Sequence, residues 1–183
     1  MPGRRLSPSP RLTECCVMTG APSSGKTAVV DELARRGFRV VPEAARAHID
    51  AELKKGRRLD EIKSDPARFE GRIFRAKLAI EGRLPARERL FLDRALPDSI
   101  AYYRLEGLDP AEPRRHSRRL RYRRVFLFER IEFMKDSVRT EDAETAAHIE
   151  QLIEAAYTDL GYAVVRVPVI AVAERADFVL AHA

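Results

Sequence analysis

Long apolar runs, cysteine and asparagine are scarce or absent in this sequence of 183 residues. No apolar run approaches the roughly 18 residues that a membrane-spanning helix needs, so we expect no membrane span. Residues 1–11, MPGRRLSPSPR, carry positive charge without an apolar segment behind it, which argues against a secretory signal. We therefore expect a cytoplasmic protein in which residues 1–11 form a flexible tail and residues 12–183 form a single domain.

Cysteine occurs only at the neighbouring positions Cys15 and Cys16, in a segment that reads as a strand. Adjacent side chains of a strand point to opposite faces of the sheet, so a bridge between them would distort the backbone. The pair therefore predicts two buried free thiols, as expected in a reducing cytoplasm. The histidines, at positions 48, 116, 148 and 182, lack the spacing of metal ligands and predict no zinc site.

The missing asparagine and the excess of positive charge both bear on the ligand. Without asparagine the chain lacks the N-K-x-D loop that commonly selects guanine, which favours ATP. The formal net charge of +6 indicates an anionic partner, such as a nucleotide, a phosphorylated metabolite, nucleic acid or an acidic membrane surface. Basic residues are densest from Arg114 to Arg124. Aromatic residues do not interleave there beyond Tyr122, so a solvated or phosphate-facing helix is favoured over a nucleic-acid interface.

Apolar segments of strand length alternate with amphipathic segments of helix length along the chain. The expected strands cover residues 13–18, 38–42, 89–93, 124–128 and 162–168. The expected helices cover residues 26–37, 43–56, 66–83, 97–107, 140–161 and 172–183, with residues 57–65 as a connection. Because the strands are nearly continuously apolar and alternate with helices, the pattern predicts an α/β fold. Its core would be a five-stranded parallel sheet with helices on both faces.

The segment GAPSSGKT, from Gly20 to Thr27, matches the pattern G-x-x-x-x-G-K-[ST] between the first expected strand and the first expected helix. In this arrangement backbone N–H groups and the helix amino terminus surround a β-phosphate, which indicates a three-layer P-loop NTPase fold. We expect Lys26 to reach the β- and γ-phosphate oxygens and Thr27 to ligate Mg²⁺. The predicted ATP-binding residues of the loop are Gly20, Ala21, Pro22, Ser23, Ser24, Gly25, Lys26, Thr27 and Ala28.

A P-loop also needs an acid at the end of a neighbouring strand, and the segment LFLD ends in Asp93. We expect Asp93 to hold Mg²⁺ directly or through water; the alternative is that it only caps the next helix. The next residue is Arg94, where hydrolysing ATPases usually place a glutamate that orients water. Activation of water is therefore unsupported, and a cation beside the phosphates suits transfer to a bound acceptor.

Two further segments carry candidate substrate-binding and catalytic residues. Glu43 follows the second expected strand, at the sheet edge where ligands bind, and there it can take a proton from a substrate hydroxyl. Arg46, one helical turn further along, can hold an anionic group of the substrate. The alternative for Glu43 is that it only complements the dipole of the helix that it begins. Arg130, Lys135 and Arg139 form a basic segment where P-loop kinases carry a lid, and a solvated surface loop is the alternative.

The ordered motifs TGAPSSGKT, VPEAAR, LDRALPDSIAYYR, RYRRVFLF, DSVRTED and VVRVPV resemble the NadR-type AAA family of small P-loop proteins. That family is related to the ribosylnicotinamide kinase domain of a regulator of NAD biosynthesis. The resemblance implies ATP and Mg²⁺ at the glycine loop and Asp93, with Arg139 on a lid. It also implies an adenine-side wall built from Val167, Pro168 and Val169.

The resemblance extends in part to a second group of P-loop enzymes. The pair Asp93–Arg94 is similar to the acid–arginine pair of deoxynucleoside kinases, whose acidic base stands where Glu43 stands here. Two residues depart from the family pattern. Ala28 replaces the second hydroxyl often found after the loop lysine, and Ser137 stands where a glycine commonly follows the lid aspartate.

These observations predict a Mg-ATP-dependent phosphotransferase acting on a small hydroxyl-bearing metabolite, such as a nucleoside. The predicted catalytic residues are Lys26, Glu43, Asp93, Arg94 and Arg139, and the predicted acceptor-binding residues are Glu43, Arg46 and Arg94. The alternative is a slowly hydrolysing switch that passes its nucleotide state to a protein, nucleic acid or membrane partner. A ring-forming AAA+ motor is disfavoured, because the chain is too short to add the usual helical lid domain.

Overall fold

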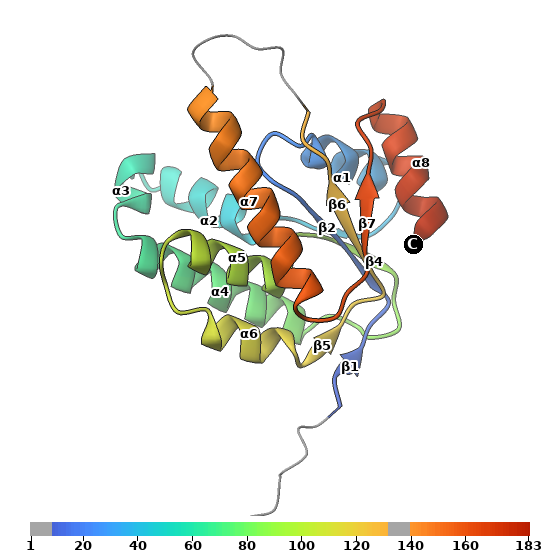
Figure 1. Cartoon of the computed structure of the whole chain (residues 1–183), viewed down its shortest axis with the longest axis horizontal. Coiled ribbons are helices and arrows are strands. Elements are labelled where there is room, and N and C mark those ends of the chain that lie inside the picture. The colour runs from blue at the N-terminus through green and yellow to red at the C-terminus, as the bar shows by residue number, and fades with distance from the viewer. Residues whose placement is uncertain (1–8, 132–139) are drawn as a thin grey trace, which may run out of the picture.

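A computed structural model, which describes residues 9–131 and 140–183, arranges the chain in three layers around one sheet (Figure 1). The sheet has five parallel strands in the order β3-β4-β2-β6-β7. Their bounds are Cys15–Thr19 for β2, Val40–Val41 for β3, Leu90–Asp93 for β4, Arg124–Phe128 for β6 and Val164–Val167 for β7. This topology confirms the predicted α/β fold and its five-stranded parallel sheet.

Helices cover both faces of the sheet. One face packs against α5 and α7 with α4 beside them, and the other packs against α1 and α8 (Figure 1). The bounds are Lys26–Arg35 for α1, Pro66–Gly82 for α4, Leu96–Leu105 for α5, Thr140–Thr158 for α7 and Val172–His182 for α8. Within the described ranges, no helix is both long enough and apolar enough to cross a membrane.

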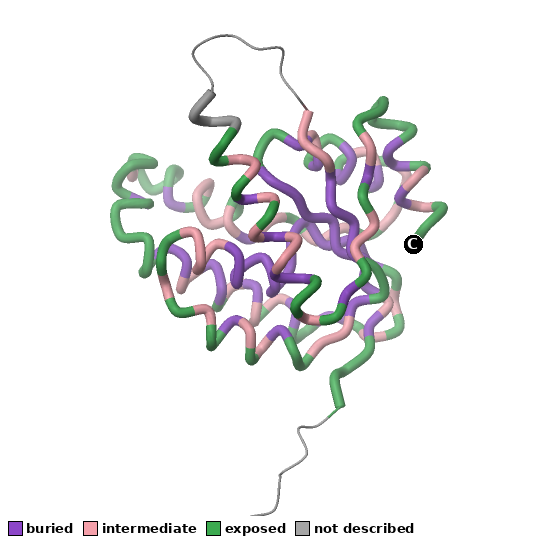
Figure 2. Tube along the Cα trace, viewed as in Figure 1, coloured by how far each residue is buried: buried purple, intermediate pink, exposed green. Residues whose placement is uncertain are grey.

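The central strand β2 shows how alternate residues supply the two faces. Cys15 and Val17 belong to the apolar cluster under α5 and α7, whereas Cys16 and Met18 belong to the cluster under α1 and α8. Burial is therefore continuous along the strands at the centre of the molecule, drawn in purple in Figure 2. The two thiols are free and buried on opposite faces, as the sequence predicted.

A third apolar cluster lies where α2 (Ala44–Leu53), α3 (Leu59–Lys63) and α4 meet. Residues 57–65 were expected to be only a connection, but they contain α3. This short helix forms because Ile62 is buried against α4 and because two acidic residues in its first turn complement the helix dipole. The cluster positions α2 and α4 on the side of the sheet where β3 ends.

The basic run from Arg114 to Arg124 does not form one helix. Its first part lies in α6 (Ala111–Ser117), and the chain then enters β5 (Leu120–Arg121), which pairs in parallel with β1 (Arg11–Leu12). Tyr122 is 3% exposed and anchors the run in the core, whereas Arg123 and Arg124 on either side of the start of β6 are exposed. The prediction that the whole basic run forms a helix is thus wrong for residues 118–124. Arg11, the last residue of the expected flexible tail, is part of β1.

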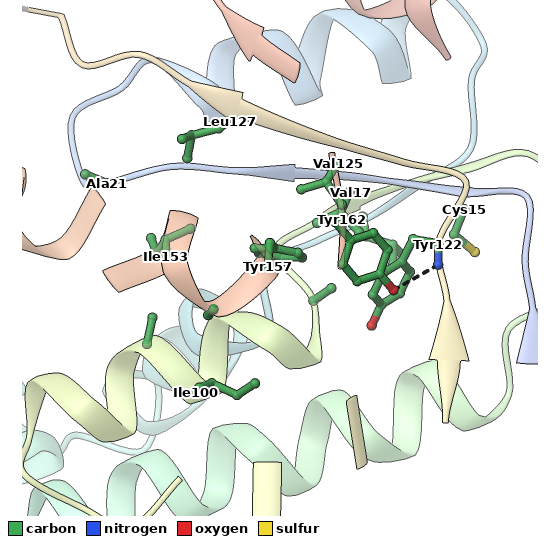
Figure 3. Close-up of a cluster of buried hydrophobic side chains, with 14 of the residues drawn as sticks. Cys15, Val17, Ala21, Ile100, Tyr122, Val125, Leu127, Ile153, Tyr157 and Tyr162 are labelled. Atoms are coloured by element: carbon green, nitrogen blue, oxygen red, sulfur yellow. Dashed lines mark hydrogen bonds between the residues drawn. The ribbon is translucent and has the colours of Figure 1, made fainter. Parts of the chain in front are cut away.

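The core between the sheet and α7 contains three tyrosines with bonded hydroxyl groups (Figure 3). The hydroxyl of Tyr162 accepts a hydrogen bond from the backbone N–H of Tyr122 at 3.2 Å. The hydroxyl of Tyr157 donates to Asp98 at 2.6 Å, and that of Tyr122 donates to Glu81. Because a buried hydroxyl without a partner is costly, these bonds fix how α4, α5 and α7 pack on the sheet.

Glu81, near the end of α4, is a carboxylate only 3% exposed. Its Oε1 accepts a hydrogen bond at 2.7 Å from the backbone N–H of Leu96, which begins α5. Burial raises the pKa of Glu81 from 4.5 to about 7, although the hydroxyl of Tyr122 and the ammonium of Lys77 oppose the rise. Between pH 4.5 and about 7, the carboxyl group of Glu81 is therefore ionised in the unfolded chain but protonated in the folded chain.

We therefore predict that Glu81→Gln flattens the pH dependence of stability. Because the pKa of Glu81 is raised in the folded state, the free energy of unfolding of the wild type falls by at most roughly 3 kcal/mol as pH rises from 4.5 to about 7. The glutamine keeps both hydrogen-bond partners but cannot ionise. Urea unfolding at several pH values checks this, and identical pH slopes for the two proteins would contradict it.

Candidate active site

The glycine loop joins β2 to α1, and its backbone takes conformations that few residues adopt. Ser23 has φ of 62° and Gly25, at the N-cap of α1, has φ of 72°, both in the left-handed region. A side chain at Gly20 would lie 2.8 Å from the carbonyl oxygen of Phe128, so the loop passes close to β6. Residues 21–27 of the loop line a cleft, whereas the predicted residues Gly20 and Ala28 do not. The N–H groups in the first turn of α1 have no acceptor within the helix, so they can donate hydrogen bonds to a phosphate bound at the loop.

Lys26 and Asp93 form a buried ion pair beside the loop, with side chains 5% and 6% exposed. Asp93 lies opposite Met18 in the parallel pairing of β2 with β4, which is why the strand acid reaches the loop lysine. Burial raises the pKa of Asp93, and the ammonium of Lys26 opposes that rise. Thr27 is exposed and lines the cleft. The structure thus pairs the expected lysine with the expected acid, and the expected hydroxyl follows the lysine on the cleft wall; lysine, hydroxyl and acid are a donor set that fits polyphosphate and Mg²⁺.

Arg94 directly follows Asp93 and forms an ion pair with Glu43, which lies two residues after β3. Its φ of 65° is unusual for a residue with a side chain, and such strain is typical of functional sites. Its Nε lies 2.8 Å from Oε1 of Glu43, as an ion pair without the alignment of a hydrogen bond. Its Cζ lies 5.2 Å from the ring centroid of Tyr102. Glu43 and Arg94 therefore line the cleft as a charge pair.

Asp98, on the first turn of α5, supports Arg94 from within the core. It is fully buried, lies 3.4 Å from Nη1 of Arg94, and accepts hydrogen bonds from Thr19 at 2.5 Å and Tyr157 at 2.6 Å. Burial alone would raise the pKa of Asp98, but Lys77 and Arg94 lower it overall. Asp98 is therefore ionised and orients Arg94 by charge.

The cleft has a volume of about 710 Å³ and extends from the glycine loop to α4 and α5. Its apolar wall includes Phe69, Ile73, Tyr102, Leu105 and Ile149. Glu70 also lines it, is 7% exposed, and has no hydrogen bond or ion pair within the described part of the chain. Lys77, 5% exposed, has one hydrogen bond there, at 3.4 Å to Ser99. Burial raises the pKa of Glu70 and lowers that of Lys77.

The remaining predicted residues lie outside the centre of the cleft. Arg46 lines it, but its side chain is 76% exposed and forms an ion pair with Asp50 at 3.1 Å. Val167 is fully buried in β7, and neither Val167 nor Pro168 lines the cleft. The adenine-side wall therefore stays a prediction. Arg139 falls outside the described residues, so its role on a lid stays a prediction as well.

Sequence reasoning missed Glu70, Lys77, Asp98 and Arg175. A signal existed for three of them, because each is a charged residue within the buried stripe of an amphipathic helix. Glu70 and Lys77 share the buried stripe of α4 with Ile73, and Arg175 lies in the buried stripe of α8. A charge in such a stripe needs a partner, either in the protein or in a ligand.

The chain matches a family model described as an AAA domain over residues 15–175, which is most of its length. None of the curated proteins gives a significant match. The family match agrees with the resemblance to NadR-type AAA proteins that the motifs carried, and it confirms that resemblance.

Solved structures of low sequence identity share the fold. The NadR protein in complex with NR is 20% identical with a TM-score of 0.69, over 93% of this chain and 50% of that chain. The NadR protein in complex with NAD and AMP-PNP is 18% identical with a TM-score of 0.64, over 93% and 49%. Deoxyadenosine kinase from M.mycoides is 14% identical with a TM-score of 0.61, over 91% and 96%. The chain thus spans about half the length of the NadR chains it matches.

We predict that Gly25→Ala weakens binding of Mg-ATP by roughly tenfold or more. A Cβ at Gly25 would lie 2.9 Å from Cδ1 of Ile131 and 3.0 Å from Nη1 of Arg175, so either the loop or these two side chains, one of which is bonded to the loop, must shift. Gly37→Ala is the matched control, because Gly37 also has positive φ, 89°, but nothing within 4 Å. Both variants should lose about 1 kcal/mol of stability. Calorimetric titration should separate them, and equal Mg-ATP affinity in both would count against this geometry.

Proposed function

This chain belongs to the AAA-domain family, and from that premise we propose that it is a Mg-ATP-dependent phosphotransferase acting on a hydroxyl group of a small nucleoside-like acceptor. The observation that carries the proposal is the position of the Glu43–Arg94 pair, which lines the same cleft as the glycine loop. A base and a cation next to a phosphate-binding loop suit transfer to a bound hydroxyl.

The nucleotide half of the proposed reaction rests on the loop and the strand acid. Lys26 would pair with the phosphate oxygens, while Thr27 and Asp93 would hold Mg²⁺. ATP supplies the phosphoryl group, and the metal offsets its negative charge. The NadR structure that contains AMP-PNP has the same fold and supports this assignment. The lid role of Arg139 belongs to the same proposal.

In the acceptor half, Glu43 would take the proton of the acceptor hydroxyl as that oxygen bonds to the γ-phosphorus and ADP leaves. Arg94 would offset the charge that develops on the transferred group, and Asp98 keeps its guanidinium in place. The residue after Asp93 is a cation and not a water-orienting glutamate, so transfer is favoured over hydrolysis.

The far end of the cleft supports a nucleoside-like acceptor. Phe69, Tyr102 and the aliphatic wall suit a flat, partly apolar ring. Glu70 can accept a hydrogen bond and Lys77 can donate one, which suits a ring with a polar edge. The names of structural neighbours, a deoxyadenosine kinase and NadR in complex with NR, point to acceptors of this class.

We also infer that residues 12–183 act as one domain in the cytoplasm. The apolar clusters on both faces of the sheet share its strands, which supports a single unit. The two buried free thiols support a reducing compartment.

We predict that Glu43→Gln abolishes acceptor-dependent transfer while leaving Mg-ATP affinity nearly intact. The amide keeps the shape of the carboxylate but cannot take a proton at neutral pH. The assay incubates protein and Mg-ATP with a panel of nucleosides and sugar alcohols, and detects ADP together with the phosphorylated product by mass spectrometry.

Glu88→Gln serves as the control, because Glu88 lies at the opposite end of β4 and pairs on the surface with Arg39. It should retain wild-type transfer. ADP release that never depends on an acceptor, together with a silent Glu43→Gln, would overturn the kinase assignment in favour of a slowly hydrolysing switch.

A further inference from the structure

Arg175 is a buried cation that the proposed reaction does not use directly. It belongs to α8, which packs beside α1 near the end of the chain (Figure 1). Its side chain is 2% exposed and does not line the cleft. Arg175 therefore contacts the glycine loop from the core, outside the cleft.

The guanidinium joins the glycine loop to the segment that follows β6. Its Nη1 donates to the carbonyl oxygen of Ser24 at 2.8 Å, and its Nη2 donates to the carbonyl oxygen of Glu129 at 3.4 Å. Its Cζ lies 4.8 Å from the ring centroid of Phe128, so the ring supports the guanidinium plane. Its Nε has no partner within the described residues.

The bond to Ser24 determines where the next amide points. A trans peptide is planar, and its C=O and N–H groups point in opposite directions. With the carbonyl of Ser24 turned to Arg175, the N–H of Gly25 points away from Arg175, and Gly25 itself lines the cleft. Gly25, with φ of 72°, is the N-cap of α1, and no side-chain cap accepts a hydrogen bond from the first amides of the helix.

Burial lowers the pKa of Arg175, and the nearby charge of Glu129 opposes that effect. In the described ranges, 9–131 and 140–183, its hydrogen bonds go to carbonyl oxygens only, and no carboxylate forms an ion pair with it. A buried cation in contact with the loop raises the electrostatic potential at the phosphate side, because low-dielectric surroundings screen it little. Its retention without a carboxylate makes sense if an anion binds on the far side of the loop.

We infer that Arg175 is a positioning residue for the polyphosphate, which orients the Gly25 amide toward the cleft and adds positive charge behind the loop. The inference rests on the proposed nucleotide binding but concerns a different part of the molecule. Its effect belongs to the phosphate chain alone, so a ligand without a base is as informative as ATP.

The test compares Arg175→Met, Arg175→Lys and wild type by calorimetric titration with Mg-ATP and with Mg-tripolyphosphate. Arg175→Met should weaken both ligands by about tenfold or more, and by the same factor, because a charge-assisted bond and a full charge are lost. Arg175→Lys should recover part of the affinity, because it keeps the charge but cannot bridge two carbonyl groups with a planar fork.

Arg36→Met is the matched control. Arg36 also joins α1 to α8, through a 2.5 Å contact with Asp177 and a 3.2 Å contact with the carbonyl of Ala173, but neither contact involves the glycine loop. It should bind both ligands as the wild type does. Equal losses in Arg36→Met and Arg175→Met would reduce Arg175 to a packing role and overturn the inference.

Two other results would also decide the matter. Wild-type affinity in Arg175→Met, or in the equally uncharged Arg175→Gln should the methionine variant not fold, would overturn the role of Arg175 and leave the proposed function standing. Failure of the wild type itself to bind Mg-ATP or tripolyphosphate would instead overturn the proposed nucleotide binding, and the inference with it.

Discussion

The buried ion pair between Lys26 and Asp93 is the interaction on which the site depends. It exists because β2 and β4 are parallel neighbours, so the residue that ends β4 lies beside the loop that leaves β2. Two buried charges hold each other in place at the point where a polyphosphate and a divalent ion would meet.

A second set of charges, centred on Arg94, lies between the part of the cleft proposed to bind the nucleotide and the part proposed to bind the acceptor. Arg94 lies between them, since it follows Asp93 in the chain and contacts Glu43 and Asp98 through space. The left-handed backbone of Arg94 turns the chain from β4 into α5. Its backbone N–H donates a hydrogen bond to the carbonyl oxygen of Met18 at 2.9 Å, which holds this conformation. Arg175 completes the arrangement from behind the loop. Lys26 and Arg94 line the cleft and Arg175 contacts the glycine loop, so three separate segments of the chain supply positive charge around the loop.

Local signals were enough to predict much of this site. The glycine loop and the acid at the end of β4 lie at strand ends, and in a parallel sheet those ends meet at one edge. Glu70, Lys77 and Arg175 required knowledge of which helix face turns inward, which depends on packing between distant segments. Packing also explains α3 and β5: Ile62 of α3 is buried against α2 and α4, and β5 forms because it pairs with β1, more than a hundred residues earlier in the chain.

The most direct test of the central claim measures whether Asp93 couples metal to nucleotide at the loop. Equilibrium titrations should compare Mg-ATP with ATP in excess chelator, for wild type and Asp93→Asn. The account predicts saturable binding by the wild type that Mg²⁺ strengthens, and loss of that strengthening in the variant. Absence of saturable binding, or an unchanged response to Mg²⁺ in Asp93→Asn, would contradict it.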